Sequence, residues 1–366
     1  MAFEADPVDS VPAPVRVRVT TMQDVARASG VSQSTVSRVL SGAPAAVPIT
    51  PETRRRVLEE AQRLRYRPNP LASALRGART MLLGVIVRDI TDPFFSGPIE
   101  AVSTQAAARG YNVVLGHAHG KADEAMALRT VLETRHTDAI LLLGDMSDQP
   151  RVLEDLRSAS IPLVAMWTGS AVPGICTVNV DNHWGVAAAV KHLLKLGHRD
   201  IAFVAGRMLG DIRQRRAAFV DTMNELGGNI PRGYIQQVRN DPAGGVAALE
   251  ALIALPVPPT AVVASTDVLA IGVLHAADRL GLRVPDDLSV IGFDDIHVAA
   301  FTVPSLTTVR MPVAEMAAVA VREALEPTPG ADRIREHVIR PSLVVRRSSG
   351  PAPKQRISKI AKRVTQ

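Results

Sequence analysis

The 366-residue sequence is poor in cysteine and in aromatic side chains: Cys176 is its one cysteine, and aromatic residues make up 3% of the chain. A single cysteine excludes a disulfide within the chain and predicts a reducing compartment. No stretch reaches the roughly 18 uncharged apolar residues that a membrane span needs. Residues 1–14 carry prolines and acids in place of the apolar run of a signal peptide. We therefore expect a cytoplasmic protein with no membrane partner, in which residues 1–18 form a disordered extension.

The motifs of common catalytic sites are also missing. The chain has no Gly-x-Ser-x-Gly elbow, no phosphate loop ending in Gly-Lys-Ser/Thr and no His-Glu-x-x-His. His117 and His119 lie two positions apart, but no cysteine or third histidine nearby completes a metal-site spacing. The sequence predicts no enzyme, no cofactor and no metal site.

Positive charge is concentrated at the two ends of the chain. Residues 15–80 hold twelve arginines and four acids, a net charge of +8, and residues 351–366 add +5. Residues 1–14 carry −3, so that residues 81–350 contribute −4 to the total of +6. A basic module of this kind is typical of phosphate binding. An anionic membrane or RNA could use the same charge, although Tyr66 is the one aromatic residue available there for base stacking. We interpret residues 349–366 as a basic disordered tail, with a second DNA contact as the alternative.

Residues 20–40 predict two short helices that meet at Gly30. Glycine suits a left-handed turn because it lacks a Cβ, and Ser32 can cap the second helix. Val25, Ala26, Val31, Val36, Val39 and Leu40 can form a small core. The opposite face of the second helix carries candidate base-reading residues, namely Gln33, Ser34 and Arg38, and candidate phosphate contacts, namely Thr35 and Ser37. This pattern predicts a helix-turn-helix that enters the major groove of DNA.

A third helix is predicted after Thr50-Pro51, since threonine caps a helix and proline suits its first turn. Val57, Leu58, Ala61 and Leu64 recur at helical spacing and are expected to complete the core. Further on, Pro68, Asn69 and Pro70 begin a segment of about two turns that ends at Gly77. So short a helix is marginal alone, and we expect it to order when paired with a second copy on DNA.

From Met81 onward, short apolar runs alternate with amphipathic helices such as 185–196 and 268–280, which predicts parallel sheets. The predicted strands are residues 82–87, 111–115, 139–143, 163–166, 177–180, 201–204, 261–264 and 289–293. About 260 residues of this pattern suit two Rossmann-like lobes. Ligands of such sheets bind at the carboxyl ends of the strands, so the cleft between the lobes is the expected binding site.

Several ordered motifs carry a resemblance to a known family. They are Asp24-Val25-Ala26, Gly30-Val31-Ser32, Thr35-Val36-Ser37-Arg38-Val39, Asp92-Pro93-Phe94-Phe95, Val180-Asp181-Asn182, residues 192–199, Gly292-Phe293-Asp294-Asp295 and residues 304–309. In this order they resemble the lactose-repressor/galactose-repressor (LacI) family of bacterial transcription factors, up to about Arg347.

The resemblance implies an α-helical helix-turn-helix headpiece, residues 19–68, a hinge helix and linker, residues 69–80, and an α/β periplasmic-binding-protein-like core of two lobes, residues 81–348. Within the hinge it implies Asn69, Ala72 and Leu75 as minor-groove contacts, with Leu75 wedging between base pairs. The effector-binding residues that it implies are Phe94, Phe95, Arg213, Thr266 and Asp294. Asp145 and Asp148 follow the third predicted strand and are expected to line the other wall of the effector site. Phe95 is equally well interpreted as plain core.

Other residues near these positions are expected to serve the scaffold. Asp267 and Asp295 suit helix caps, Asp181 suits the crossing between the lobes, and Arg215 and Arg216 are expected to be solvated. Trp167 departs from the resemblance, since an aspartate is common near that position. Part of the polar ligand network is therefore expected to be either missing or replaced by stacking.

The function implied is a sequence-specific transcriptional regulator, most simply a repressor. It would bind a near-palindromic double-stranded operator as a homodimer, associate with the nucleoid, and respond to a sugar or sugar-like effector between the lobes. The alternative is a ligand-blind architectural DNA-binding protein that uses its core for dimerisation alone. The sequence leaves open the effector, the sign of the response, the operator and the choice between dimer and tetramer.

Overall fold

The computed structural model describes residues 20–41, 48–66, 79–117, 137–148, 150, 153–154, 156, 161–228, 230–326 and 335–354. The chain divides into two compact units, Met1–Arg79 and Thr80–Gln366. The hinge residues Asn69, Ala72 and Leu75, together with His119 and both terminal extensions up to residue 19 and from residue 355, lie outside the described residues.

The first unit contains three helices, α1 (Met22–Ser29), α2 (Gln33–Ser41) and α3 (Pro51–Arg63). Gly30 ends α1 with a left-handed φ of 64°, as expected for this turn. Ser32 Oγ accepts a hydrogen bond from the amide of Thr35 at 3.2 Å, and Thr50 Oγ1 accepts from the amide of Thr53 at 3.2 Å. The predicted turn and both predicted caps are therefore confirmed.

The core of the first unit contains Val25, Ala26, Val36, Val39, Val57 and Ala61, all buried. Val31, Leu40 and Leu64 pack against it, partly buried. Leu58 is a correction to the predicted core, since 46% of it is exposed. Val57 and Ala61 lie one turn apart and occupy the buried stripe of α3, so Leu58 is rotated away from it.

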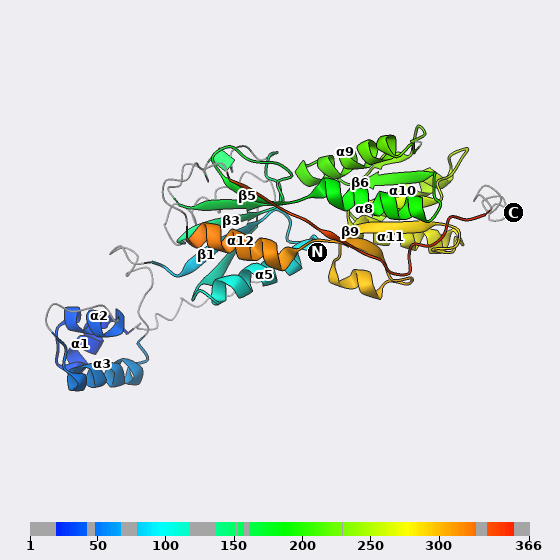
Figure 1. The fold of residues 1–366 in the computed structure, drawn as a ribbon. Helices are drawn as coiled ribbons and strands as arrows, with labels where there is room; N and C mark the ends of the chain where they lie inside the picture. The colour runs from blue at the N-terminus through cyan, green and yellow to red at the C-terminus, as the bar shows by residue number, and fades with distance from the viewer. Residues whose placement is uncertain are drawn as a thin grey trace, which may run out of the picture. The chain divides into compact units, whose positions relative to one another are not determined.

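The second unit is built on two six-stranded sheets (Figure 1). The first sheet, lobe 1, has the strand order β11-β5-β4-β3-β1-β2, and the second, lobe 2, has the order β12-β10-β9-β8-β6-β7. All pairings are parallel except that of β10 with β12, which is antiparallel. The strands are β1 (Leu82–Val87), β2 (Asn112–His117), β3 (Ala139–Leu143), β4 (Leu163–Met166), β5 (Cys176–Val180), β6 (Ile201–Ala205), β7 (Ile235–Gln237), β8 (Ala261–Ala264), β9 (Ser289–Asp294), β10 (Thr307–Arg310), β11 (Glu336–Ile339) and β12 (Ser342–Val344). The expected core of two parallel α/β lobes is confirmed.

The eight predicted strands all form, whereas β7, β10, β11 and β12 were not predicted. These four have only three or four residues and carry polar side chains, as in Ile-Gln-Gln of β7 and Thr-Thr-Val-Arg of β10. β7, β11 and β12 are edge strands. All four unpredicted strands form because they hydrogen-bond to a neighbouring strand of the sheet, and no local apolar pattern reveals such a partner.

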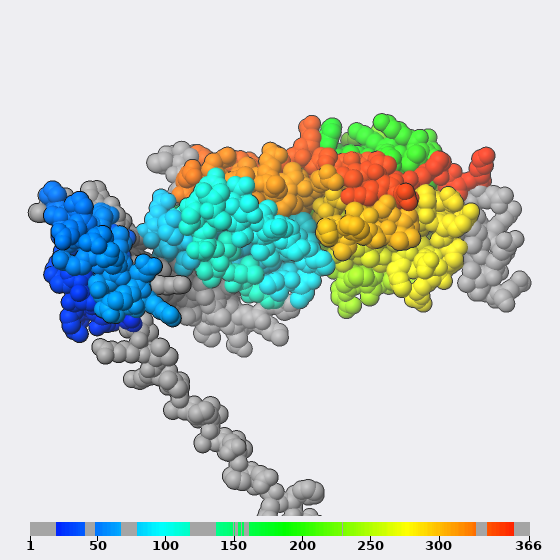
Figure 2. Space-filling view, turned by 90° about the horizontal axis from the view of Figure 1, so that it is seen from below, coloured from blue at the N-terminus to red at the C-terminus, as the bar shows by residue number. Residues whose placement is uncertain are grey.

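Helices cover both faces of the lobe 2 sheet. The helices α8 (Asn182–Lys195) and α9 (Gly210–Glu225) pack on one face, and α10 (Pro242–Ile253) and α11 (Asp267–Arg279) on the other. In lobe 1, α5 (Ser96–Ala107) and α12 (Val313–Leu325) lie side by side on one face, as Figures 1 and 2 show. Short 3-10 turns occur at η1 (Pro93–Phe95) and η2 (His297–Phe301). None of the helices in the described ranges has the length and apolar character to cross a membrane.

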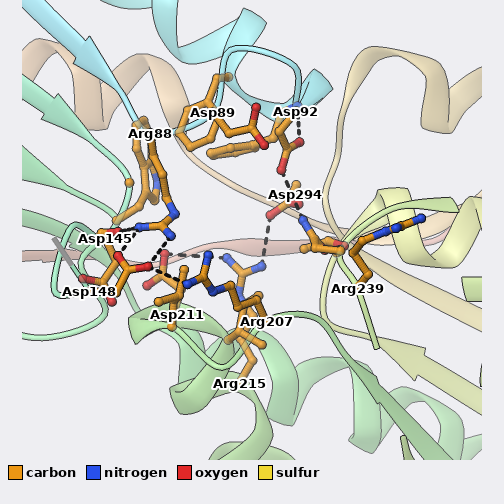
Figure 3. Close-up of a pocket in the computed structure, with 18 of the residues that line it drawn as sticks. Arg88, Asp89, Asp92, Asp145, Asp148, Arg207, Asp211, Arg215, Arg239 and Asp294 are labelled. Atoms are coloured by element: carbon orange, nitrogen blue, oxygen red, sulfur yellow. Dashed lines mark hydrogen bonds and ion pairs between the residues drawn. The ribbon is translucent and has the colours of Figure 1, made fainter. Parts of the chain in front are cut away.

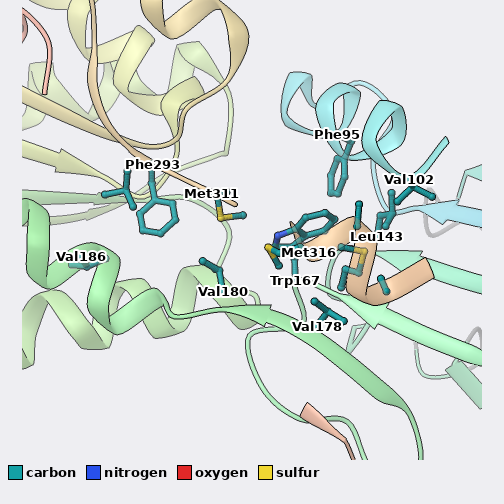
Figure 4. Close-up of a cluster of buried hydrophobic side chains, with 14 of the residues drawn as sticks. Phe95, Val102, Leu143, Trp167, Val178, Val180, Val186, Phe293, Met311 and Met316 are labelled. Atoms are coloured by element: carbon teal, nitrogen blue, oxygen red, sulfur yellow. The ribbon is translucent and has the colours of Figure 1, made fainter. Parts of the chain in front are cut away.

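The chain passes between the lobes three times: from β5 to α8, from β10 to α12 and from β11 to β12. One apolar cluster continues through this junction, and it joins residues of lobe 1, such as Trp167 and Val178, to Phe293 and Met311 of lobe 2 (Figure 4). The carboxyl ends of the strands of both sheets face this junction, because the residues that follow β1, β3, β6 and β8 line the space between the lobes.

The crossing of α10 and α11 depends on two glycines. A Cβ on Gly272 would lie 2.1 Å from the carbonyl oxygen of Pro242, and one on Gly245 would lie 2.2 Å from that of Leu269. These neighbours are backbone atoms, which cannot rotate out of the way.

We predict that Gly272→Ala destabilises the core unit by about 1–3 kcal/mol, because the added methyl overpacks this crossing. The matched control is Gly97→Ala in α5, where a Cβ meets no atom within 4 Å. That change is expected to be neutral or to stabilise by about 0.5–1 kcal/mol. Urea unfolding followed by circular dichroism measures both, and equal midpoints for the two variants would refute the crossing argument.

Candidate ligand pocket and nucleic-acid interface

The second helix of the first unit presents a polar face. Gln33, Ser34 and Arg38 are exposed, and Thr35 and Ser37 are half-buried beside them. Val36 and Val39 occupy the opposite, buried face. The hydroxyl of Ser32 lies 2.8 Å from those of Ser34 and Thr35, so the start of α2 is held in one hydrogen-bonded cluster. The side chains that were predicted to read DNA thus share one accessible surface.

Exposed arginines continue the charge onto α3, where Arg54, Arg55 and Arg56 are all exposed. Arg55 lies 3.1 Å from Glu59, and Arg63 lies 2.7 Å from Glu60. Exposed pairs of this kind contribute little to stability. This surface fits an anionic backbone rather than an apolar partner.

A cleft of about 940 Å³ opens between the two lobes of the second unit. Its walls follow the carboxyl ends of strands from both sheets, where α/β proteins bind ligands. It is lined by Arg88, Asp89, Asp92, Phe94, Phe95, Gly144, Asp145, Asp148, Trp167, Arg207, Leu209, Asp211, Ile212, Arg215, Gln237, Val238, Arg239, Asn240, Thr266, Asp294 and Met311.

Six of the seven predicted effector residues lie in this lining: Phe94, Phe95, Asp145, Asp148, Thr266 and Asp294. Arg213 does not, because it lies on the exposed side of α9. Arg215, two positions on, lines the cleft and is 2% exposed, so the prediction that it is solvated is wrong. The buried stripe of α9 runs through Asp211, Arg215, Ala218 and Thr222. Its first turns are polar, and apolar periodicity therefore does not identify that face.

The guanidinium of Arg215 is held by groups from several elements of lobe 2. It donates to Asp294 Oδ1 at 3.1 Å, to the carbonyl of Ser265 at 2.6 Å and to Asn182 Oδ1 at 2.8 Å. Its carbon also lies 3.7 Å from the centre of the Phe293 ring. Its planar fork of donors suits this set of acceptors. Arg215 therefore fixes the floor of the cleft.

Four acids of the cleft have shifted pKa values. Burial raises the pKa of Asp294 well above its ordinary value, and Arg215 opposes that rise. Burial likewise raises the pKa of Asp211 and of Asp92. The hydrogen bonds from Arg88 lower the pKa of Asp148, which is therefore fully ionised at neutral pH. Among these four acids, Asp148 keeps its negative charge, whereas burial disfavours the charged form of Asp294, Asp211 and Asp92.

Aromatic side chains form the apolar wall of the cleft. The rings of Phe94 and Trp167 meet edge to face at 5.3 Å, and those of Phe94 and Phe95 at 5.1 Å. Phe95 is buried in the core, whereas Phe94 is half-buried. Trp167 adopts a left-handed φ of 59°, and its buried indole nitrogen has no hydrogen-bond partner among the described residues. Residues other than glycine rarely adopt that conformation.

Polar contacts tie the two lobes together across the cleft. The amide of Gly210, the first residue of α9, donates to Asp145 Oδ2 of lobe 1 at 2.7 Å. Arg88 of lobe 1 and Arg207 of lobe 2 both reach Asp148, at 2.7 and 2.8 Å (Figure 3).

Further contacts support these ties. Asn240 of lobe 2 donates to Asp92 Oδ2 of lobe 1 at 3.2 Å and accepts from Thr266 Oγ1 at 2.8 Å. A Cβ on Gly210 would lie 1.9 Å from the carbonyl oxygen of Thr168, so the two backbones touch where the lobes meet.

The sequence missed Arg88, Arg207 and Asn240 as cleft residues. Arg88 follows β1 directly and Arg207 is the second residue after β6, and this position could have identified both. Asn240 follows β7, which was not predicted, so its loop had no recognisable start.

Three acids serve the scaffold. Asp181 caps α8 by accepting from the amide of Trp184 at 2.8 Å. Asp267 and Asp295 are not helix caps, which corrects the prediction: Thr266 caps α11. Asp267 accepts from Thr308 and from the amide of Ile296, and burial raises its pKa to about 7. Asp295 pairs with Arg310 at 2.6 Å and with Arg346 at 2.7 Å.

Known proteins share both units. Residues 21–69 match the model of bacterial regulatory proteins of the lacI family, and residues 190–349 match that of the periplasmic binding protein-like domain. The transcriptional repressor PurR of Erwinia tasmaniensis is 32% identical over 342 residues, covering 92% of this chain and 98% of the relative.

Two solved structures show the same fold. The lac repressor dimer bound to operator and the anti-inducer ONPF aligns over 91% of this chain and 100% of its own, with a TM-score of 0.80 and 24% identity. The complex of the transcriptional regulator CelR with cellobiose aligns over 90% of this chain and 99% of its own, with a TM-score of 0.66 and 27% identity.

The ties between the lobes can be tested from both sides. Asp145→Ala removes the acceptor of the Gly210 amide, and Gly210→Ala prevents the approach of Thr168. A hydrogen bond to a charged group contributes about 1.5–3 kcal/mol, so amide exchange at residue 210 should accelerate by roughly tenfold or more in either variant. Hydrogen–deuterium exchange measures this, with Asp286→Ala, an exposed acid paired to Arg283, as the control. Unchanged exchange in both cleft variants would show that the tie does not hold the lobes.

Proposed function

Because the chain belongs to the lacI family of bacterial regulatory proteins, which are transcriptional regulators and not enzymes, we propose that it is a repressor whose operator affinity is set by a small molecule. The proposed binding site of that molecule is the cleft between the lobes. The observation that carries this proposal is that one chain contains both features: a helix with an accessible polar face in its first unit, and a cleft of about 940 Å³ lined by polar and aromatic side chains in its second. Such a repressor works in the cytoplasm, on the nucleoid.

The proposed DNA contact is made by α2. The amide of Gln33 has a donor and an acceptor that match the adenine edge in the major groove, and Arg38 has paired donors that match the guanine edge, with Ser34 beside them. Thr35 and Ser37 are short enough to contact phosphates. The resemblance to the family further implies that Asn69, Ala72 and Leu75 belong to a hinge that enters the minor groove, and this stays a prediction.

The proposed assembly is a homodimer on a near-palindromic operator. LacI-family repressors bind operator DNA as dimers, as the lac repressor dimer does. In this chain Val298, Phe301 and Val303 are 49%, 72% and 94% exposed; the first two lie in η2 and Val303 lies two residues after it. Large apolar side chains gathered in one segment are typical of a protein interface. A two-fold pair presents two recognition helices to two half-sites.

The lining of the cleft favours a neutral, polyhydroxylated effector such as a sugar. Arg88, Arg207 and Arg215 are already paired with acids, so no excess positive charge awaits an anionic ligand. Carboxylates such as Asp294 accept hydrogen bonds from hydroxyl groups, and Phe94 with Trp167 offers an apolar wall for a sugar ring. CelR, which is 27% identical, was solved with cellobiose.

The proposed response acts through the ties between the lobes. In the arrangement of the lobes described above, Asp145, Asp148 and Asp92 each bond to a residue of the other lobe. A ligand that takes the place of those partners changes the free energy of this arrangement relative to one in which the lobes lie at another angle. DNA binding can change only if the ligand binds the two arrangements with different affinity. The unpartnered indole nitrogen of Trp167 is a further donor that a ligand oxygen can satisfy after a small shift.

One observation favours a second candidate, a ligand-blind DNA-binding protein. The polar ties between Asp145 and Gly210, between Asp148 and Arg207 and between Asp92 and Asn240 already join the lobes without any ligand. A core locked in this way could serve for dimerisation alone.

A thermal-shift screen of the full chain against sugars, sugar phosphates, nucleosides and purines separates the two candidates. A ligand that binds only the folded state at 100 times its dissociation constant adds about 2.7 kcal/mol of stability. We expect a neutral sugar to raise the melting temperature, and Asp294→Asn to weaken that shift while the exposed control Asp286→Asn preserves it. No hit with any class, together with intact operator binding, would favour the ligand-blind candidate.

The base-reading role of Arg38 predicts a specific loss in Arg38→Ala. Operator affinity should fall by about 1–3 kcal/mol, the value of one bidentate base contact, while affinity for unrelated DNA falls much less. Arg55→Ala, an exposed arginine on α3 paired with Glu59, is the matched control and should affect both DNAs alike. Fluorescence anisotropy at fixed salt measures both, and equal losses on the two DNAs for Arg38→Ala would exclude base reading.

A further inference from the structure

Three side chains with metal-binding chemistry meet in lobe 1, away from the cleft. They are Cys176 on β5, Glu323 on α12 and His337 on β11, and their ligand atoms all lie within 4.8 Å of one another. They are far apart in the sequence. Spacing alone therefore predicted no metal site.

The register of the sheet explains how they meet. His337 is the partner of Val178 in the parallel pair of β5 and β11. Cys176 lies two residues before Val178 and hence on the same face of the sheet. α12 packs against that face of β5, and Glu323 belongs to its last turn. The cluster lies at the amino end of β5, whereas the cleft lies at the carboxyl ends of the strands.

One atom in the cluster has no satisfactory partner. His337 Nε2 is buried and makes no hydrogen bond to any residue in the described ranges, although it lies 3.5 Å from Glu323 Oε1. A buried polar atom left unpaired costs about 1–3 kcal/mol. The cluster therefore offers a nitrogen lone pair that the described protein groups do not use.

The chemistry of the donors selects the ion. We propose that this cluster binds Zn²⁺ through Cys176 Sγ, a carboxylate oxygen of Glu323 and His337 Nε2, with water as the fourth ligand. Tetrahedral zinc with bonds of 2.0–2.3 Å separates its ligand atoms by about 3.3–3.8 Å. The 3.5 Å between His337 and Glu323 is within this range. A sulfur ligand disfavours Mg²⁺ and Ca²⁺, which prefer oxygen.

Two arginines also contact the carboxylate of Glu323 and would compete with a cation for it. Arg335 lies 3.4 Å from Glu323 Oε2 and thus contacts the carboxylate oxygen opposite the one nearest His337. Arg322 also lies 3.4 Å from Oε1, but it is half exposed and can turn to solvent.

An ion here would join three segments that lead to or from the crossings between the lobes. β5 and β11 each enter a crossing, and α12 begins after the third. The ion would link the last turn of α12 to both strands, and the consequence is a more stable lobe 1. This proposal does not depend on the nature of the effector.

Cobalt titration of the reduced, chelator-treated full chain tests the site, because Co²⁺ replaces Zn²⁺ and gives a sulfur-to-cobalt charge-transfer absorption. We expect one equivalent to bind with that band, to be displaced by Zn²⁺, and to raise the melting temperature. Cys176→Ser should abolish the band. Glu323→Gln and His337→Ala should each weaken binding by more than the roughly tenfold that loss of an outer-shell partner costs. His183→Ala, an exposed histidine on α8, is the matched control and should bind as the unaltered chain does.

Three results would each overturn the proposal. The first is the absence of a charge-transfer band in the unaltered chain. The second is a band that survives in Cys176→Ser, and the third is affinity that is unchanged in both Glu323→Gln and His337→Ala. Circular dichroism of each variant confirms that it has folded, and the pair of single-ligand variants keeps the test decisive if one of them does not fold.

Discussion

The buried guanidinium of Arg215 is the constraint on which the cleft depends. At 2% exposure its charge and its donors must be satisfied by the protein, because water cannot reach them. The acceptors come from the start of α8, the end of β8 and the end of β9, namely Asn182, Ser265 and Asp294. A single side chain thereby fixes three chain segments relative to α9. The carboxylate and the aromatic face that a ligand would meet are held in place by this requirement.

Around that fixed floor, the cleft is closed by contacts that a ligand could exchange. Asp148 is shared between Arg88 of lobe 1 and Arg207 of lobe 2, and Asp145 accepts from the first amide of α9. Such contacts lose little when an equivalent partner replaces them, since the gain from protein–ligand bonds offsets the loss of protein–protein bonds. The contacts that hold the site rigid are those of Arg215, and the contacts that a ligand could replace are those of Asp145 and Asp148. This separation suits a protein that switches between two arrangements of its lobes.

Helix caps contribute much to the stability of the first unit, whereas large apolar clusters stabilise the second. The first has six fully buried core residues, all small or medium in size, and relies on caps at Thr21, Ser32 and Thr50. The second has long apolar clusters that cover both faces of its lobe 2 sheet. The small unit is accordingly the one that can present most of its recognition helix to another molecule, because few of its side chains are needed for packing.

The sequence by itself determined the features that depend on local periodicity and on residues adjacent in the chain. The Gly30 turn, the caps at Ser32 and Thr50, the eight predicted apolar strands and the cleft positions Asp145 and Asp148 behind one of those strands follow from patterns within a few residues. Only the tertiary structure decided which of Arg213 and Arg215 faces the cleft, because the buried stripe of α9 is polar at its start. It also decided the short edge strands β7, β11 and β12, whose backbone is satisfied only by a neighbour. Cys176, Glu323 and His337 meet for the same reason, since their contact depends on sheet register and on the packing of α12, neither of which is written in any local pattern.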